Sequence, residues 1–209
     1  MSNIQLETEL SKQHKKNLYT VFWIHAFMFL VVFSAAIYAD SSALLADSLD
    51  FIGDAGSYAL SIYVMSRGVL IRAASAILKA IVMLLFGMPM MVYTIMRLNS
   101  EVIPDPLIMN ISGILGILAH MVCIYFLISF RKGDSNMLSV WICTINDLIS
   151  NVLIVIASIA IGISNSILPD IIAAAVIISM ALYGACIILI TALKEIKSIK
   201  DKQYVRANT

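Results

Sequence analysis

SSALLADSLDFIGDAGS, residues 41–57, is apolar enough to lie in a membrane and yet carries three aspartates. Asp47, Asp50 and Asp54 are spaced i, i+3 and i+7, which places them on one narrow stripe of a helix. An ionised aspartate near the centre of a bilayer costs roughly 2.5–3.5 kcal/mol on insertion scales. Three on one face therefore predict a compensating partner inside the protein, and a cation is the simplest one.

Composition places the chain among integral membrane proteins. Of its 209 residues, 61% are hydrophobic and 13% are charged, whereas soluble domains are about 45–50% apolar and about 25% charged. The formal net charge of +1 gives no reason to expect a nucleic-acid partner. The three cysteines lie inside apolar runs, which argues against a disulfide framework. We expect a multi-pass protein of the cell membrane, with the lipid bilayer as its surroundings.

Six apolar segments reach the roughly 20 residues that a helix needs to cross a bilayer. We therefore expect an all-α protein with six transmembrane helices, the third of them broken by Gly87 and Pro89. Residues 1–16 would form a cytoplasmic amino-terminal segment, and residues 194–209 a short basic cytoplasmic tail. The six-helix domain, residues 17–193, would contain helices at residues 17–39, 42–65, 73–96, 107–130, 137–163 and 168–193.

The basic residues mark one side of the predicted bundle. Lysines and arginines gather before the first helix, in the second and fourth loops, and after the last helix, whereas the opposite side offers Arg97 alone. The positive-inside rule then places both termini in the cytoplasm. The second and fifth helices run in opposite directions in this topology, as two inverted three-helix halves require.

The fifth predicted helix carries a second polar pair. Cys143 and Asp147 are spaced i, i+4, like Asp50 and Asp54, and Asn151 follows one turn later. Two such pairs on facing helices can surround one ion with four side chains. Carboxylates and a thiolate fit a four-coordinate divalent metal, zinc above all, with cobalt, cadmium and iron as further candidates. On its own, Cys143 would be interpreted as a packing residue.

Charge balance predicts that protons take part as well. Three carboxylates and one thiolate overcompensate a single dication, so some of these groups must carry protons when the metal leaves. Metal and protons then compete for the same atoms, which is the physical basis of proton-coupled exchange. The predicted partners are therefore divalent cations and protons, and the metal is cargo rather than a resident cofactor.

Other polar residues in the spans are assigned supporting roles. Asp47 is a ligand on the way into the site, a packing acceptor or a proton carrier, and these alternatives stay open. His120 lies in mid-span and is a candidate proton relay, and Asn146 and Asn151 are candidate hydrogen-bonding neighbours of the ligands. For His25 the favoured interpretation is a hydrogen-bonded core histidine.

Two further predictions concern helix packing. Lys79, near the start of the third helix, is expected to extend its ammonium group to the membrane interface, with an interhelical ion pair as the alternative. Gly113 and Gly116 form a small-residue face that is typical of close helix contacts.

Residues 46–54 resemble the second helix of the cation diffusion facilitator family, whose motif there is Ala-Asp-Ser-x-[His/Asp]-x-x-x-Asp. Asp50 and Asp54 fall on the two ligand positions of that motif, and Cys143 and Asp147 match the family's fifth-helix motif His-x-x-x-Asp. Further matches are RKGDSNM at residues 131–137 and PDII at residues 169–172. The resemblance extends over residues 17–193.

The resemblance implies a divalent-metal/proton antiporter that exports its ion from the cytosol and opens to each side in turn. Family members are usually dimers, so a homodimer through the membrane helices is implied. Three departures modify these expectations. Cys143 replaces the usual histidine, the loop between the second and third helices has no histidine-rich tract, and we expect a short form without the family's cytoplasmic carboxy-terminal domain.

Rival functions use similar residues. A metal-binding channel or sensor without proton coupling would carry the same ligands, because spacing does not encode coupling. An intramembrane aspartyl hydrolase is expected to carry Gly-x-Gly-Asp, and here Phe51 stands where the first glycine belongs. Asp50 and Asp54 also lie one turn apart on one helix, which suits chelation better than a catalytic dyad across helices. We therefore expect no enzymatic activity.

Overall fold

The computed structural model describes residues 3–207, with side chains described for residues 12–201. This range contains six α-helices, two short 3₁₀ helices and the connections between them. This range contains no strand, which confirms the all-α prediction. The α-helices are α1 (Asn3–Ala39), α2 (Ser42–Val64), α3 (Val69–Met96), α4 (Pro106–Leu127), α5 (Ser135–Ser164) and α6 (Leu168–Ala207). The 3₁₀ helices η1 (Arg97–Asn99) and η2 (Ile128–Lys132) follow α3 and α4.

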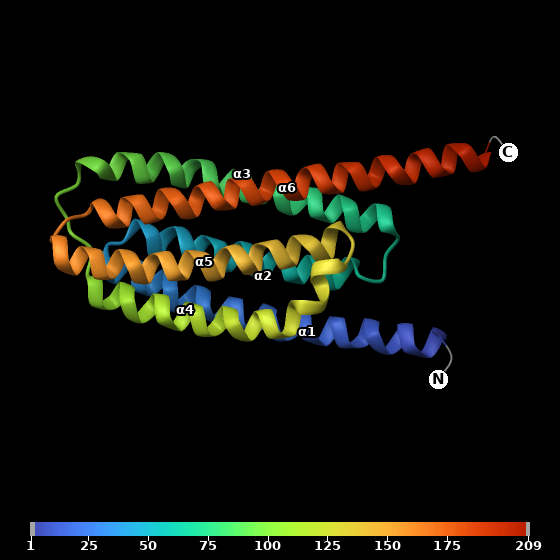
Figure 1. The fold of residues 1–209 in the computed structure, drawn as a ribbon, viewed down its shortest axis with the longest axis horizontal. Helices are drawn as coiled ribbons and strands as arrows, with labels where there is room; N and C mark the ends of the chain where they lie inside the picture. Colours follow the sequence, from blue (N-terminus) through green and yellow to red (C-terminus); the bar gives the residue numbers. More distant parts are fainter. Residues whose placement is uncertain (1–2, 208–209) are drawn as a thin grey trace.

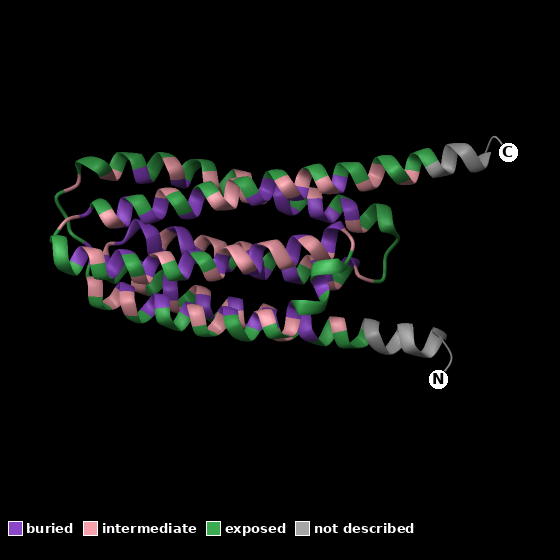
Figure 2. Ribbon diagram, in the orientation of Figure 1, coloured by how far each residue is buried: buried purple, intermediate pink, exposed green. Residues whose placement is uncertain are grey.

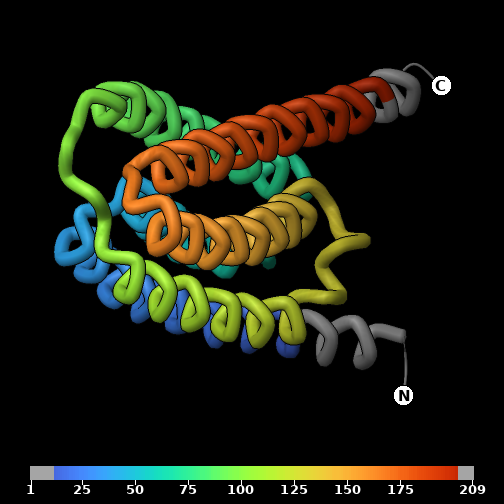
Figure 3. Tube along the Cα trace, turned by 60° about the vertical axis from the view of Figure 1, so that its left-hand side comes forward, coloured from blue at the N-terminus to red at the C-terminus, as the bar shows by residue number. Residues whose placement is uncertain are grey.

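The helices lie side by side as an elongated bundle, with α2 and α5 in its middle (Figure 1). On one side α1 packs against both α2 and α4, and on the other α3 packs against α6 (Figure 3). Contacts within residues 3–96 have counterparts later in the chain, since α1–α2 corresponds to α4–α5 and α2–α3 to α5–α6. This pairing has the pattern that two three-helix halves would produce.

Polarity is distributed in the reverse sense to that of a soluble protein. The outer faces carry large apolar side chains, such as Trp23, Leu85 and Ile163, whereas ionisable side chains such as His25 and Asp47 are buried. Figure 2 shows the buried positions turned toward the inside of the bundle and the exposed ones outward. Five helices, all except α2, are long and apolar enough to cross a membrane. These properties indicate a membrane protein.

The start of α2 is fixed by a network of hydrogen bonds that reaches across to α6. Ser41 caps the helix, and its side chain accepts a hydrogen bond from the amide of Leu44 at 3.1 Å. The buried carboxylate of Asp170 in turn accepts from the Ser41 hydroxyl at 2.6 Å and from the amides of Ser42 and Ala43 at 2.8 and 3.1 Å. The helix that carries the three aspartates is thereby held in a defined position along the bundle.

The predicted break in the third helix is wrong, because α3 is continuous from Val69 to Met96 with Pro89 inside it. Proline removes only one amide donor, the one that would bond the carbonyl of Leu85, so the helix continues on either side. Gly87 serves close packing instead of ending the helix. A Cβ atom there would lie 2.9 Å from Cδ2 of Leu182 on α6.

Several helix ends also differ from the expected boundaries. The first helix begins at Asn3 rather than at residue 17, α4 gives way to η2 after Leu127, and α6 continues to Ala207 rather than ending near residue 193. Glu195 offers one reason for the longer α6. Its carboxylate accepts a hydrogen bond from the Ser135 amide at the start of α5, at 3.1 Å, which ties the extension to the bundle.

Candidate functional site

A cavity of about 440 Å³ lies between α2, α3, α5 and α6 near the middle of the bundle. Its lining includes all four side chains that the spacing predicted as metal ligands: Asp50, Asp54, Cys143 and Asp147. The two i, i+4 pairs therefore face one space from two neighbouring helices. No local sequence pattern predicts that α2 and α5 are neighbours. The two helices pack against each other in the middle of the fold.

The four side chains differ in exposure. Asp54, Cys143 and Asp147 are buried, whereas Asp50 is partly exposed. The carboxyl group of Asp54 interacts with both the carboxyl group of Asp147 and the thiol of Cys143. Asp50 is close enough to repel both Asp54 and Asp147 when they are ionised. Carboxyl groups crowded in this way need protons or a cation between them.

A second sulfur atom lies beside the thiol. Sδ of Met83, on α3, is 3.9 Å from Sγ of Cys143, and both residues line the cavity. The contact places a thioether next to a candidate thiolate ligand, a combination that suits soft transition metals better than magnesium or calcium.

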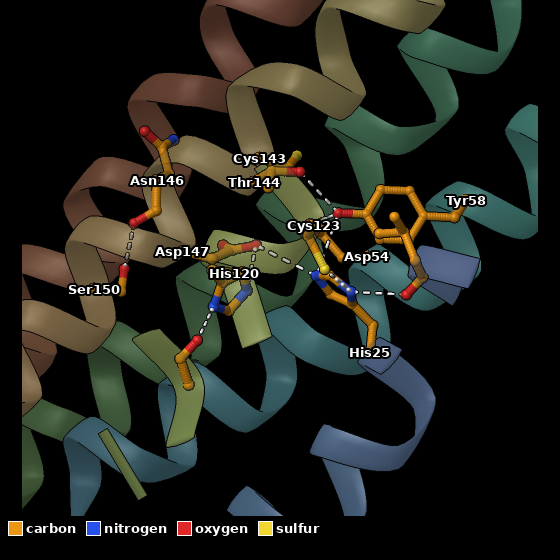
Figure 4. A network of polar contacts seen from close by, with 12 residues as sticks. His25, Asp54, Tyr58, His120, Cys123, Cys143, Thr144, Asn146, Asp147 and Ser150 are labelled. Atoms are coloured by element: carbon orange, nitrogen blue, oxygen red, sulfur yellow. Dashed lines mark hydrogen bonds and ion pairs between the residues drawn. The ribbon is translucent and has the colours of Figure 1, made fainter. Parts of the chain in front are cut away.

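Two histidines meet Asp147 from outside the cavity. Nε2 of His120, on α4, is 3.5 Å from Oδ2 of Asp147, and Nε2 of His25, on α1, is 4.0 Å from the same oxygen (Figure 4). Neither histidine lines the cavity. These three side chains offer ligand atoms that lie within 4.8 Å of one another. Of the four predicted ligands, Asp147 alone belongs to this compact group.

Tyr58 connects the cavity with the histidines. Its hydroxyl group donates a hydrogen bond to Oδ2 of Asp54 at 3.0 Å, and it lies 3.1 Å from Oγ1 of Thr144 and 3.3 Å from Nε2 of His25 (Figure 4). A hydroxyl group can both donate and accept, so Tyr58 offers a route for a proton between α2 and α1.

Asp47 does not line the cavity, although the sequence placed it on the same helical stripe as Asp50 and Asp54. It is buried and accepts a hydrogen bond at 3.0 Å from Nδ2 of Asn151. The same amide nitrogen lies 2.9 Å from the carbonyl of Asp147 and 3.5 Å from Nδ1 of His120. Of the three alternatives for Asp47, this arrangement favours a packing acceptor.

Asn146 lies apart from this group. It lines the cavity, and its Nδ2 atom is 3.5 Å from the carbonyl of Met180 on α6. The two asparagines of α5 therefore face different neighbours: Asn151 joins α2 and α4, and Asn146 faces α6.

Lys79 is buried rather than extended to the interface, so the prediction that its ammonium group snorkels is wrong. Nζ donates hydrogen bonds to Ser61 Oγ and Asn136 Oδ1, both at 2.6 Å, and to Ser139 Oγ at 3.2 Å. Lys79 also lines the cavity. The three oxygens replace the water that the ammonium group would otherwise seek, which is why the side chain stays inside.

Sequence reasoning missed the contacts of Tyr58 and Lys79 and the approach of His25 to Asp147, although His25 is the buried, hydrogen-bonded histidine that was expected. Each is an ionisable residue within an apolar segment, and that signal alone marks it for attention. No spacing rule indicates that His25 on α1 and His120 on α4 approach the same aspartate, because the two lie 95 positions apart in the sequence.

Comparison with known proteins adds no assignment, because no family model and no curated protein matches this chain. The proposed function therefore rests on the geometry of the cavity and of the histidines beside Asp147.

Proposed function

We propose that this protein transports a divalent transition-metal cation across the cell membrane in exchange for protons, with export from the cytosol as the direction. Zinc is the favoured cargo, and cobalt, cadmium and iron are further candidates. The observation that carries the proposal is the cavity lined by Asp50, Asp54, Cys143 and Asp147. Its motifs resemble those of the cation diffusion facilitator family, and membership of that family is part of the proposal.

The donor set supports a transition metal. Three carboxylates and a thiolate, with the Met83 sulfur 3.9 Å from the thiol, favour a borderline or soft ion over the hard ions that take oxygen ligands alone. The site is in the interior of the bundle, where an ion would be shielded from lipid. Buried carboxylates in a membrane protein are typical of ion pathways and proton relays.

Charge balance supports the exchange of protons for metal. The four ligands carry four negative charges when all are ionised, and a dication supplies only two positive ones. Lys79, which lines the same cavity, contributes one more. When the metal leaves, protons must replace its charge on the crowded carboxyl groups, so the departure of the ion and the uptake of protons are coupled.

The fold supports six spans with both termini in the cytoplasm. The start of α1 and the end of α6 lie at the same end of the bundle, and so do the connections α2–α3 and α4–α5, which carry basic residues (Figure 1). In this proposal α2 is the sixth span, with Asp47 and Asp54 buried by the other helices and Asp50 partly exposed. A homodimer through the apolar outer faces completes the proposal.

The direct test is metal flux in proteoliposomes. We expect Asp54→Ala and Asp147→Ala to abolish zinc transport, because each removes a carboxylate from the cavity. Glu101→Ala is the matched control, since Glu101 is an exposed carboxylate outside the cavity, and its flux should equal that of the unaltered protein. Correctly inserted Asp54→Ala and Asp147→Ala proteins with normal zinc flux would refute the site.

A further inference from the structure

His25 and His120 approach Asp147 from the side of the protein that the cavity does not reach. They come from α1 and α4, which pack against each other, and their side chains are 0% and 1% exposed. Asp147 is 5% exposed, and it contacts the two histidines while also lining the cavity. An ion bound to Asp147 could therefore also bind either the cavity side chains or the two histidines.

Backbone carbonyl groups determine which nitrogen of each ring carries the hydrogen. Nδ1 of His25 is 2.9 Å from the carbonyl of Val21, and Nδ1 of His120 is 2.9 Å from the carbonyl of Gly116. A carbonyl oxygen only accepts, so each Nδ1 carries the hydrogen and each Nε2 of a neutral ring presents its lone pair. Histidines that bind metals are oriented in the same way, with the second nitrogen donating to a carbonyl or carboxylate.

Both Nε2 atoms face one carboxylate oxygen, and that of His25 also lies 3.3 Å from the Tyr58 hydroxyl group. Nε2 of His120 and Oδ2 of Asp147 are buried, and neither has a hydrogen-bond partner among the described residues. Two nitrogen lone pairs and a carboxylate oxygen repel one another unless a positive charge lies between them. Leaving such groups unsatisfied destabilises the fold, and most strongly when the group is charged.

The spacing fits a metal ion better than a proton. An N–H···O hydrogen bond spans about 2.7–3.2 Å, whereas the two nitrogens lie 3.5 and 4.0 Å from the aspartate oxygen. Ligand atoms around a tetrahedral ion with bonds of roughly 2.0–2.2 Å are separated by roughly 3.3–3.6 Å. The three ligand atoms lie within 4.8 Å of one another, so His25 has to move toward the other two for all three atoms to reach that separation.

We propose that His25, His120 and Asp147 form a second binding station for a divalent transition-metal ion, with Asp147 shared between this station and the cavity. Two imidazole nitrogens and one carboxylate oxygen leave a fourth coordination position open, as in sites where an ion exchanges ligands. A shared carboxylate allows an ion to pass from the cavity to the histidines without leaving the protein. The choice of ion rests on the proposed function, whereas the site itself rests on the histidine geometry.

Zinc X-ray absorption on the purified full-length protein tests this station. In the unaltered protein with excess zinc, we expect imidazole scattering alongside sulfur scattering. In a variant with the cavity disabled, Asp50→Asn combined with Cys143→Ser, we expect zinc to stay bound through nitrogen and oxygen, with the imidazole signal retained and the sulfur signal at about 2.3 Å lost.

Histidine variants on the cavity-disabled background complete the test. Adding His25→Gln and His120→Gln should weaken zinc binding at least about tenfold. Adding His14→Gln should change nothing, because His14 lies outside the group and its ring contacts Ser129 instead. Equal zinc affinity with and without His25 and His120 would overturn the second station.

The outcomes separate this inference from the proposed function. Sulfur scattering without any imidazole signal in the unaltered protein would overturn the second station and leave the cavity site standing. An unaltered protein that binds no zinc, cobalt or cadmium would overturn both. Because the measurement on the unaltered protein requires no substitution, misfolding of a variant cannot obscure the result.

Discussion

Asp147 is the residue at which the polar contacts of four helices meet. Its carboxyl group interacts with Asp54 on α2 and faces His25 on α1 and His120 on α4, while it is itself part of α5. The electrostatic environment of this carboxyl group depends on the charge of the cavity and on the protonation of the two histidines. Among the candidate ligands, Asp147 is therefore the one whose loss should affect metal binding and proton movement together.

Cys143 determines the expected metal preference. Replacing it with histidine exchanges a soft sulfur ligand for a nitrogen ligand and also separates Met83 from its sulfur neighbour. We predict that Cys143→His retains transport but lowers the rank of cadmium relative to zinc in proteoliposome flux. Cys186→Ser is the control, because Cys186 is exposed and does not line the cavity. The same metal ranking in Cys143→His would mean that the thiol is not a ligand.

Gly116 is required by the side chain of Asn151. A Cβ atom at Gly116 would lie 1.7 Å from Oδ1 of Asn151, whereas a Cβ atom at Gly162 would meet nothing within 4 Å. Overpacking of this kind costs about 1–3 kcal/mol, so we predict that Gly116→Ala lowers the thermal unfolding temperature in detergent. Gly162→Ala should be neutral or stabilising by up to about 1 kcal/mol, because alanine favours the helix. Equal unfolding temperatures for the two variants would contradict this account.

Groups of residues that share one face of a single helix were predictable from their spacing. Contacts between side chains of different helices were not. The i, i+4 pairs of α2 and α5 indicated four residues that line the cavity, because both members of each pair share one face. The small face of Gly113 and Gly116 was also predicted correctly, since Cβ atoms there would contact α5. Lys79 was misjudged because its partner Asn136 lies on another helix. His25 is the buried, hydrogen-bonded histidine that the sequence predicted, but its approach to Asp147 on α5 was not predictable.

At the scale of the helices, the start of α2 depends on a residue of α6. The carboxylate of Asp170 accepts three hydrogen bonds from residues 41–43, and no side-chain spacing in the sequence indicates that contact. It fixes where α2 begins and hence the height of Asp50 and Asp54 in the bundle.

We predict that Asp170→Ala destabilises the protein by at least about 1–3 kcal/mol, because buried donors at the start of α2 lose their acceptor. Asp170→Asn should cost less, since its amide oxygen can still accept. Thermal unfolding of both variants in the same detergent measures the difference. An Asp170→Ala protein as stable as the unaltered one would show that the cap does not hold α2.

The number and order of the helices followed from apolar length, but their ends did not. Hydropathy indicates where a helix is buried in lipid, whereas α6 continues beyond the apolar segment, where Glu195 binds the Ser135 amide of α5. The supposed break at Pro89 failed for a related reason. Loss of one amide bond is tolerated within a helix that packs along α6 over its length.

For the whole molecule, the sequence correctly predicted a membrane protein of the all-helical class. Its matching i, i+4 pairs indicated the four residues that line the cavity, whereas the packing of α2 against α5 that brings them together is a property of the fold. It did not predict the histidine group beside Asp147, which arises only when α1 and α4 pack together next to α5.

We propose that metal moves through this protein in exchange for protons at a site that includes Asp147. Zinc uptake into proteoliposomes, measured with and without an imposed pH gradient, is the decisive test. We predict that the unaltered protein concentrates zinc only when the gradient is present, and that Asp147→Asn, which keeps the side chain's size but removes its charge, concentrates none. Zinc that merely equilibrates at the same rate with and without the gradient would contradict the claim and indicate a passive pathway.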